Sequence, residues 1–216
     1  MSGPLQNRVR PDGTLDADGA RGLFTGNRGI VHNPDTKRLA GRRWTTPAWI
    51  CCALRYRDQH RDVWGRNGPD GGTGWTELFF LDEITALAAG HRPCHACRRE
   101  AARRFGALFH AAHGTASTPQ IDRILHGERQ LSSKQERQAL SAIDLPDLPE
   151  GTMVEADGRF HALRGRRALP WSHSGYGGAE TFGDLGRHAL RLVTPKSILP
   201  VLRAGYSPHW HRSAEV

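Results

Sequence analysis

The pattern of apolar and polar residues divides the chain into a strand-rich part, a helical part and a second strand-rich part. Apolar residues form short blocks over residues 49–57 and 77–81, which is typical of strands. Between Asp82 and Ile143 they recur mainly at spacings of three and four, which is typical of helices with one buried face. From Thr152 onward, short apolar blocks return between glycine-rich turns. The pattern therefore predicts an α+β fold.

Capping residues indicate where the first helices begin and end. Asp82 can cap the N-terminus of one helix, and Gly90 suits its C-terminal end. A second helix is expected after Cys97, because five apolar residues there share one helical face. These residues are Ala101, Phe105, Leu108, Phe109 and Ala112.

Three more helices are expected further along the chain. Thr118 followed by Pro119 indicates an N-terminus. Ser133 and Glu136 match a capping box in front of another helix. The last is expected over residues 198–204, with its proline in the first turn. Strands should dominate the sequence around it.

These elements suggest four regions. Residues 1–30 lack hydrophobic periodicity and are expected to form an extended arm. A small mixed α+β module is expected over residues 31–115 and a helical connector over 116–150. A β-rich C-terminal subdomain is expected over 151–216.

Composition narrows the class of protein. The 216 residues are 38% hydrophobic, which is enough for a core and argues against disorder of the whole chain. The formal net charge is +8, and arginine supplies nearly all of the positive charge. This balance favours a polyanion such as DNA or another nucleic acid as a partner. A GC-rich genome, which raises Arg, Ala and Gly together, is the alternative explanation.

No secretory signal and no apolar run of the ~18 residues that a bilayer requires are visible. A cytoplasmic location is therefore expected, with no membrane partner. Thiols stay reduced in that compartment, so paired cysteines there indicate metal or redox chemistry before structural disulfides.

Cys94 and Cys97 are the strongest chemical signal in the sequence. Two intervening residues allow both sulfur atoms to bind one ion from a loop and the following helix start, which is half of a tetrahedral zinc site. A redox role would require a βαβ context, which the sequence does not show. We therefore expect zinc as the cofactor.

The other half of this zinc site is less regular. Cys51 and Cys52 are adjacent, so their side chains should point to opposite faces of a strand. Both can bind one ion only if the strand bulges or ends there. Otherwise one cysteine is a buried apolar residue and a histidine is the fourth ligand. His32 is the first choice for that ligand, and the others are His60, His91 and His95.

Two runs resemble the N-terminal metal-binding domain of the Ada family of bacterial DNA alkylation-repair proteins. Residues 45–52 (TTPAWICC) resemble the family's strand that ends in an aromatic-Cys step. Residues 79–100 match the family's aromatic pair, its helix ending in Ala-Ala-Gly and its Arg-Pro-Cys step with the second cysteine. The matching residues are Phe79, Phe80, Ala88, Ala89, Gly90, Arg92, Pro93, Cys94, Cys97 and Arg98.

The resemblance implies a zinc ion held by four thiolates, the first of which accepts a methyl group from a methylated DNA phosphate. By position that nucleophile is Cys51 or Cys52. The chain departs from the family in two respects: the first two ligands are adjacent instead of three residues apart, and no helix-turn-helix reader follows. The resemblance therefore favours a zinc-binding, nucleic-acid-associated protein that recognises or repairs modified DNA.

Five arginines around the cysteine pair could hold phosphates, because the guanidinium fork binds phosphate in a bidentate manner. They are Arg92, Arg98, Arg99, Arg103 and Arg104. A solvated helix face is the structural alternative.

Two other functions remain open at this point. One is a hydrolase or nuclease with a purely structural zinc, working through His173, His209 or His211 near the C-terminus. The other is a non-catalytic protein-binding module.

Overall fold

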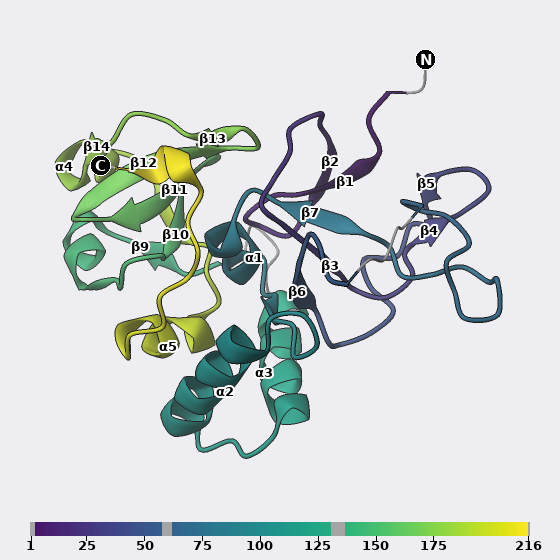
Figure 1. Cartoon of the computed structure of the whole chain (residues 1–216). Helices are drawn as coiled ribbons and strands as arrows, with labels where there is room; N and C mark the ends of the chain where they lie inside the picture. Colours follow the sequence, from purple (N-terminus) through teal and green to yellow (C-terminus); the bar gives the residue numbers. More distant parts are fainter. Residues whose placement is uncertain (1–2, 58–61, 131–136, 216) are drawn as a thin grey trace.

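The computed structural model describes residues 3–57, 62–130 and 137–215. It confirms an α+β fold, in which two sheets flank a short central helix and longer helices lie below them (Figure 1). Within the described ranges, no helix combines the length and hydropathy that crossing a bilayer requires.

The first sheet has six strands in the order β2-β1-β7-β3-β6-β8, and it is mixed because β1–β7 and β6–β8 are parallel. Apolar residues such as Val9 and Phe24 pack into its core, so the part of the chain expected to be an extended arm instead supplies three strands. The strands are β1 (Gln6–Val9), β2 (Leu15–Ala17), β3 (Phe24–Asn27), β6 (Ile50–Ala53), β7 (Leu78–Phe80) and β8 (Arg92–Pro93); a separate pair is β4 (His32–Asn33) and β5 (Arg38–Leu39).

The second sheet is antiparallel in the order β13-β12-β11-β10-β15-β9, with β14 also paired to β12. It confirms the β-rich character expected for the last quarter of the chain. Its strands are β9 (Ala139–Leu140), β10 (Met153–Ala156), β11 (Arg159–Arg164), β12 (Arg167–Ser172), β13 (Gly175–Tyr176), β14 (Glu180–Thr181) and β15 (Leu190–Leu192).

Helix α1 (Glu83–Ala88) lies at the centre of the molecule, and each of its six residues is buried (Figure 1). Ile84 and Ala88 pack against the second sheet, Ala86 packs against the first, and Leu87 packs among the longer helices. Asp82 caps this helix as expected, because its carboxylate accepts a hydrogen bond from the Thr85 N–H.

The longer helices form a third layer below α1. Helix α2 (Arg99–His113) packs against α3 (Thr118–Gln130) and α5 (Leu199–Arg203). The expected helices after Cys97, at Thr118 and near residue 200 are confirmed. Shorter elements are α4 (Phe182–Leu185) and the 3₁₀ turns Ala142–Asp147, Lys196–Ile198 and Arg212–Ala214.

The connector differs from the sequence expectation. Ser133 and Glu136, which suggested a capping box, lie outside the described residues. A few residues later Ala139 and Leu140 form the edge strand β9 instead of a helix, because they pair with β15. Ser141 then caps a 3₁₀ turn through a capping box with Asp144. Pairing with a distant strand outweighs the local helical spacing here.

Candidate metal centre

Three cysteines meet at the end of the β6–β8 strand pair. Cys52 comes from β6, Cys94 directly follows β8, and Cys97 lies in the turn that leads into α2. Their sulfur atoms all lie within 4.8 Å of one another. Zinc–thiolate bonds of about 2.3 Å in tetrahedral geometry separate sulfur atoms by about 3.8 Å, so small side-chain adjustments would place all three on one ion.

Backbone hydrogen bonds hold the two halves of this cluster together. The Cys94 N–H donates to the Cys51 carbonyl at 2.9 Å and continues the parallel pairing of β6 with β8. The Ala53 N–H donates to the Cys97 sulfur at 3.3 Å, across 44 residues of sequence. The Arg98 N–H closes the turn on the Cys94 carbonyl. The scaffold therefore fixes the three sulfur positions through β pairing and a tight turn.

The three thiols lie close enough to shift one another's pKa values. Hydrogen bonds donated to Cys94 and Cys97 raise the pKa of the Cys52 thiol. Hydrogen bonds accepted from Cys52 and Cys97, and from the backbone of Cys97 and Ala96, lower the pKa of Cys94. A thiolate that accepts several hydrogen bonds is already the form that binds a metal ion.

Cys51 lies outside the group of three. Its side chain is 1% exposed and packs with Val9, Phe24 and Leu78 in the core of the first sheet. Burial is the largest of the causes that raise the pKa of its thiol. Arg98 Nη1 lies 3.5 Å from its sulfur. The alternation of side chains along β6 therefore separates the two adjacent cysteines, as strand geometry requires.

Three of the four histidines named as possible fourth ligands lie within the described residues, and none of the three belongs to the cysteine cluster. His32 hydrogen-bonds to Thr76 Oγ1 at 2.6 Å and stacks on Trp64. His91 is fully buried beside Arg28, and the exposed His95 lies 3.2 Å from Thr118 Oγ1. His60 lies outside the described residues. Among the described residues, three side chains could therefore serve as ligands, and three protein ligands leave one position of a tetrahedral zinc ion open.

The five arginines around the cluster separate into two classes. Arg92 forms a buried fork with Asp122, at 2.7 and 2.8 Å. Arg98 donates to Glu83 at 2.8 Å and lies over the Phe24 ring. These two guanidinium groups bind internal carboxylates instead of facing outward to a phosphate.

The other three arginines lie on the exposed side of α2. Arg99 and Arg103 are exposed one turn apart, immediately after Cys97. Arg104 is also exposed and donates to the Gly205 carbonyl at 2.8 Å.

The sequence analysis did not identify Glu83, the carboxylate that forms the ion pair with Arg98. Its only sequence signal is an acidic residue in the first turn of a helix.

The C-terminal histidines have structural partners. His173 Nε2 lies 3.0 Å from Asp16, a carboxylate 157 residues earlier in the chain. The backbone of His209 donates to Glu83, and the backbone of His211 donates to Asp82. Neither His209 nor His211 belongs to a group that could hold a metal ion among the described residues. These contacts fasten the C-terminal segment to α1.

The arrangement as a whole is a cluster of three thiols that can hold a metal ion, half-exposed at one edge and backed by the core of the first sheet. Comparisons with protein-family models, with curated proteins and with solved structures find no match for this chain.

Proposed function

We propose that Cys52, Cys94 and Cys97 bind a zinc ion. The observation that carries this proposal is the convergence of three sulfur atoms within 4.8 Å from two segments more than 40 residues apart in sequence. A set of thiolates with no carboxylate selects soft or borderline ions, and zinc is the common one for tetrahedral sites rich in sulfur. Zinc would keep all three thiolates ionised at neutral pH.

Cysteine variants test this proposal. The protein is expected to carry one zinc per chain when purified from zinc-containing medium, measured by elemental analysis. Cys52→Ser, Cys94→Ser and Cys97→Ser should each lose most of that zinc. Cys51→Ala is the matched control, because Cys51 faces the core, and it should keep the metal. Zinc retained in all three Ser variants, or lost equally in Cys51→Ala, would contradict the proposal.

We further propose that the exposed edge of this centre contacts a nucleic-acid backbone. Arg99 and Arg103 are exposed in the first two turns of α2, the helix that follows Cys97, and have the fork geometry that suits phosphate. The resemblance to the Ada family then assigns the methyl-accepting thiolate to Cys52, since it belongs to the metal cluster and Cys51 does not. In that reaction the Cys52 sulfur forms a bond to the methyl carbon. The methyl–oxygen bond of the phosphotriester breaks, and a phosphodiester anion leaves.

Salt dependence tests the contact with nucleic acid. Replacing Arg99 and Arg103 together by Ala should lower the slope of log affinity against log salt concentration by about 1–2, because each lost phosphate contact removes about one released counterion. The control is the double change Arg159→Ala and Arg167→Ala, which removes the same charge from exposed positions of the second sheet. Equal slopes in both double variants would exclude this surface.

Mass spectrometry tests the methyl transfer. After incubation with methylphosphotriester DNA, it should place a methyl group on Cys52, and an unmodified Cys52 would exclude the transfer.

A further inference from the structure

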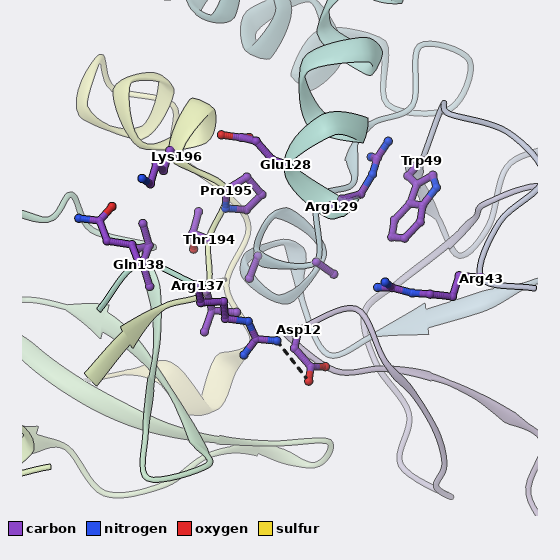
Figure 2. Close-up of a pocket in the computed structure, with 14 residues that line it drawn as sticks. Asp12, Arg43, Trp49, Glu128, Arg129, Arg137, Gln138, Thr194, Pro195 and Lys196 are labelled. Carbon is purple, nitrogen blue, oxygen red and sulfur yellow. Dashed lines mark ion pairs between the residues drawn. The ribbon is translucent and has the colours of Figure 1, made fainter. Parts of the chain in front are cut away.

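A cavity of about 220 Å³ opens between the first sheet, helix α3 and the second sheet, on residues that the metal centre does not use. Figure 2 shows Trp49 and Arg43 on one side, Glu128 and Arg129 from α3, and Arg137 and Lys196 on the opposite side. Its walls also include apolar side chains. These are Ala88, Ala89, Leu192, Val193 and Pro195.

Positive charge exceeds negative charge around this cavity. Four lining residues are cationic and two, Asp12 and Glu128, are acidic. Both acids already have partners. Asp12 lies 3.6 Å from Arg137 and accepts hydrogen bonds from Thr14, and Glu128 accepts from the backbone and hydroxyl of Ser197. Arg137 is paired with the buried Glu155 as well as with Asp12, so the excess positive charge rests on Arg43, Arg129 and Lys196 against Glu128, and it would attract an anion.

Arg28 adds a buried cation behind the Arg43 end of the cavity. It is 1% exposed; its Nε donates to His91 and its Nη1 to the Gly13 carbonyl. Its remaining nitrogen, Nη2, has no hydrogen-bond partner among the described residues. A buried guanidinium nitrogen in this condition is costly, and a bound ligand atom would relieve the cost.

The free nitrogen of Arg28 and the guanidinium of Arg43 lie on the same side of Gly13. A Cβ atom placed on Gly13 would lie 3.7 Å from Arg28 Nη2, 3.9 Å from Arg43 Nη2 and 3.8 Å from the carbonyl of Ala89, which lines the cavity. In Figure 2 the Arg43 side chain extends toward Asp12 and Arg137. Within the described ranges no ion pair involves Arg43, so its charge is available to a ligand. The Arg28 charge, which Asp12 partly offsets, acts from behind it.

The electrostatics of Arg28 agree with this geometry. Burial lowers the pKa of Arg28 well below its ordinary value, and repulsion from Arg43 and Arg129 lowers it further. Arg28 also lies over the Trp49 ring, with 3.9 Å between the guanidinium carbon and the ring centroid. The chain thus holds several like charges close together, an arrangement that a bound anion would stabilise.

We propose that this cavity binds the phosphate group of a small phosphomonoester, with Arg43 as its ligand, the buried charge of Arg28 behind it and the organic group against the apolar wall. A phosphate dianion matches both the charge excess and the fork geometry of the Arg43 guanidinium. The apolar wall formed by Val193 and Pro195 suits an organic substituent more than bulk water. Neither arginine contacts the metal cluster, so this site is independent of the proposed zinc chemistry.

Thermal unfolding of the full chain tests the proposal, with inorganic phosphate and phenyl phosphate as probes and sodium chloride at equal ionic strength as reference. At a 100-fold excess over Kd, phosphate should raise Tm by about 5–10 °C. Phenyl phosphate should reach the same shift at lower concentration, which distinguishes a phosphomonoester site from a site for free phosphate. Equal concentration dependence for the two probes would overturn the role of the apolar wall.

Arg43→Ala supplies the decisive variant, and Arg42→Ala is its neighbour and matched control. Both residues are exposed, so both variants should unfold in chloride within about 2 °C of the native protein. Arg43→Ala should lose most of the phosphate-dependent shift, and Arg42→Ala should keep it. No shift in the native protein would overturn the site. An equal shift in both variants, reproduced by sulfate, would also overturn it by indicating only general salt stabilisation.

Discussion

Cys51 and Cys52 are neighbours in sequence but lie in different environments. Cys51 is buried in the apolar core of the first sheet, and Cys52 belongs to the half-exposed cluster with Cys94 and Cys97. The alternation of strand side chains explains the separation. The register of β6 against β3 and β8 decides which cysteine faces the cluster. The sequence alone therefore leaves both residues as candidates.

The Arg92–Asp122 pair is a residue-scale feature with a measurable effect on stability. The two side chains are 8% and 10% exposed, so removing one partner leaves a charge in the protein interior. Arg92→Ala should lower the free energy of unfolding by about 3–5 kcal/mol, measured by urea denaturation. Arg99→Ala removes the same charge from an exposed position and should change it by less than about 0.5 kcal/mol. If Arg92→Ala lowered the free energy of unfolding as little as Arg99→Ala does, the Arg92–Asp122 pair would have no structural role.

At the scale of elements, local signals located α1, α2, α3 and α5, but they placed Ala139 and Leu140 in a helix and missed the strands before residue 30. The cap at Asp82 and the left-handed residues Gly90 and Gly114 fix the ends of α1 and α2 through contacts within a few residues. Strand β1, in contrast, pairs with its neighbour β2 and also with β7, where Arg8 lies opposite Phe79, about 70 residues later in the chain. Hydrophobic spacing within four residues contains no information about such a partner.

The turn between β10 and β11 is built from Asp157 and Gly158, which both have positive φ, as the Asp-Gly hairpin turn requires. The Asp157 carboxylate reaches beyond its own hairpin to the start of β15. It accepts hydrogen bonds from His188 Nδ1 at 2.7 Å and from the Ala189 N–H at 3.2 Å. The hydrogen bond from His188 is the largest cause that lowers the pKa of Asp157.

This contact predicts a pH dependence. Because the folded pKa of Asp157 lies below the ordinary value of 3.8, its stabilising contribution is present above that pH and is lost as the pH falls through the folded pKa. Carboxyl NMR titration should show a low pKa for Asp157 in the native protein and a value closer to 3.8 in His188→Ala. Asp144 is the internal control, since Ser141 lowers its pKa and His188 does not contact it. An unchanged Asp157 pKa in His188→Ala would exclude this hydrogen bond.

At the scale of the whole molecule, the α+β class and the C-x-x-C half of the metal cluster could be predicted from sequence. The packing of α1 against three different groups of elements could not, because it depends on contacts between residues far apart in the chain. The roles of Arg92 and Arg98 depend on Asp122 and Glu83, which are 30 and 15 residues away. A count of nearby arginines therefore overstates the charge available to a phosphate, since it does not include their buried partners.

The position of α1 also has a consequence for the order in which the chain can fold. Asp82 and Glu83 are buried, yet the Tyr176 hydroxyl and the backbone N–H groups of His209 and His211 reach them from up to 129 residues later. During synthesis on the ribosome, these two carboxylates would remain hydrated until residue 211 had emerged. Closure of the core around α1 therefore waits for residues 209–211, long after the strands of the first sheet have been synthesised.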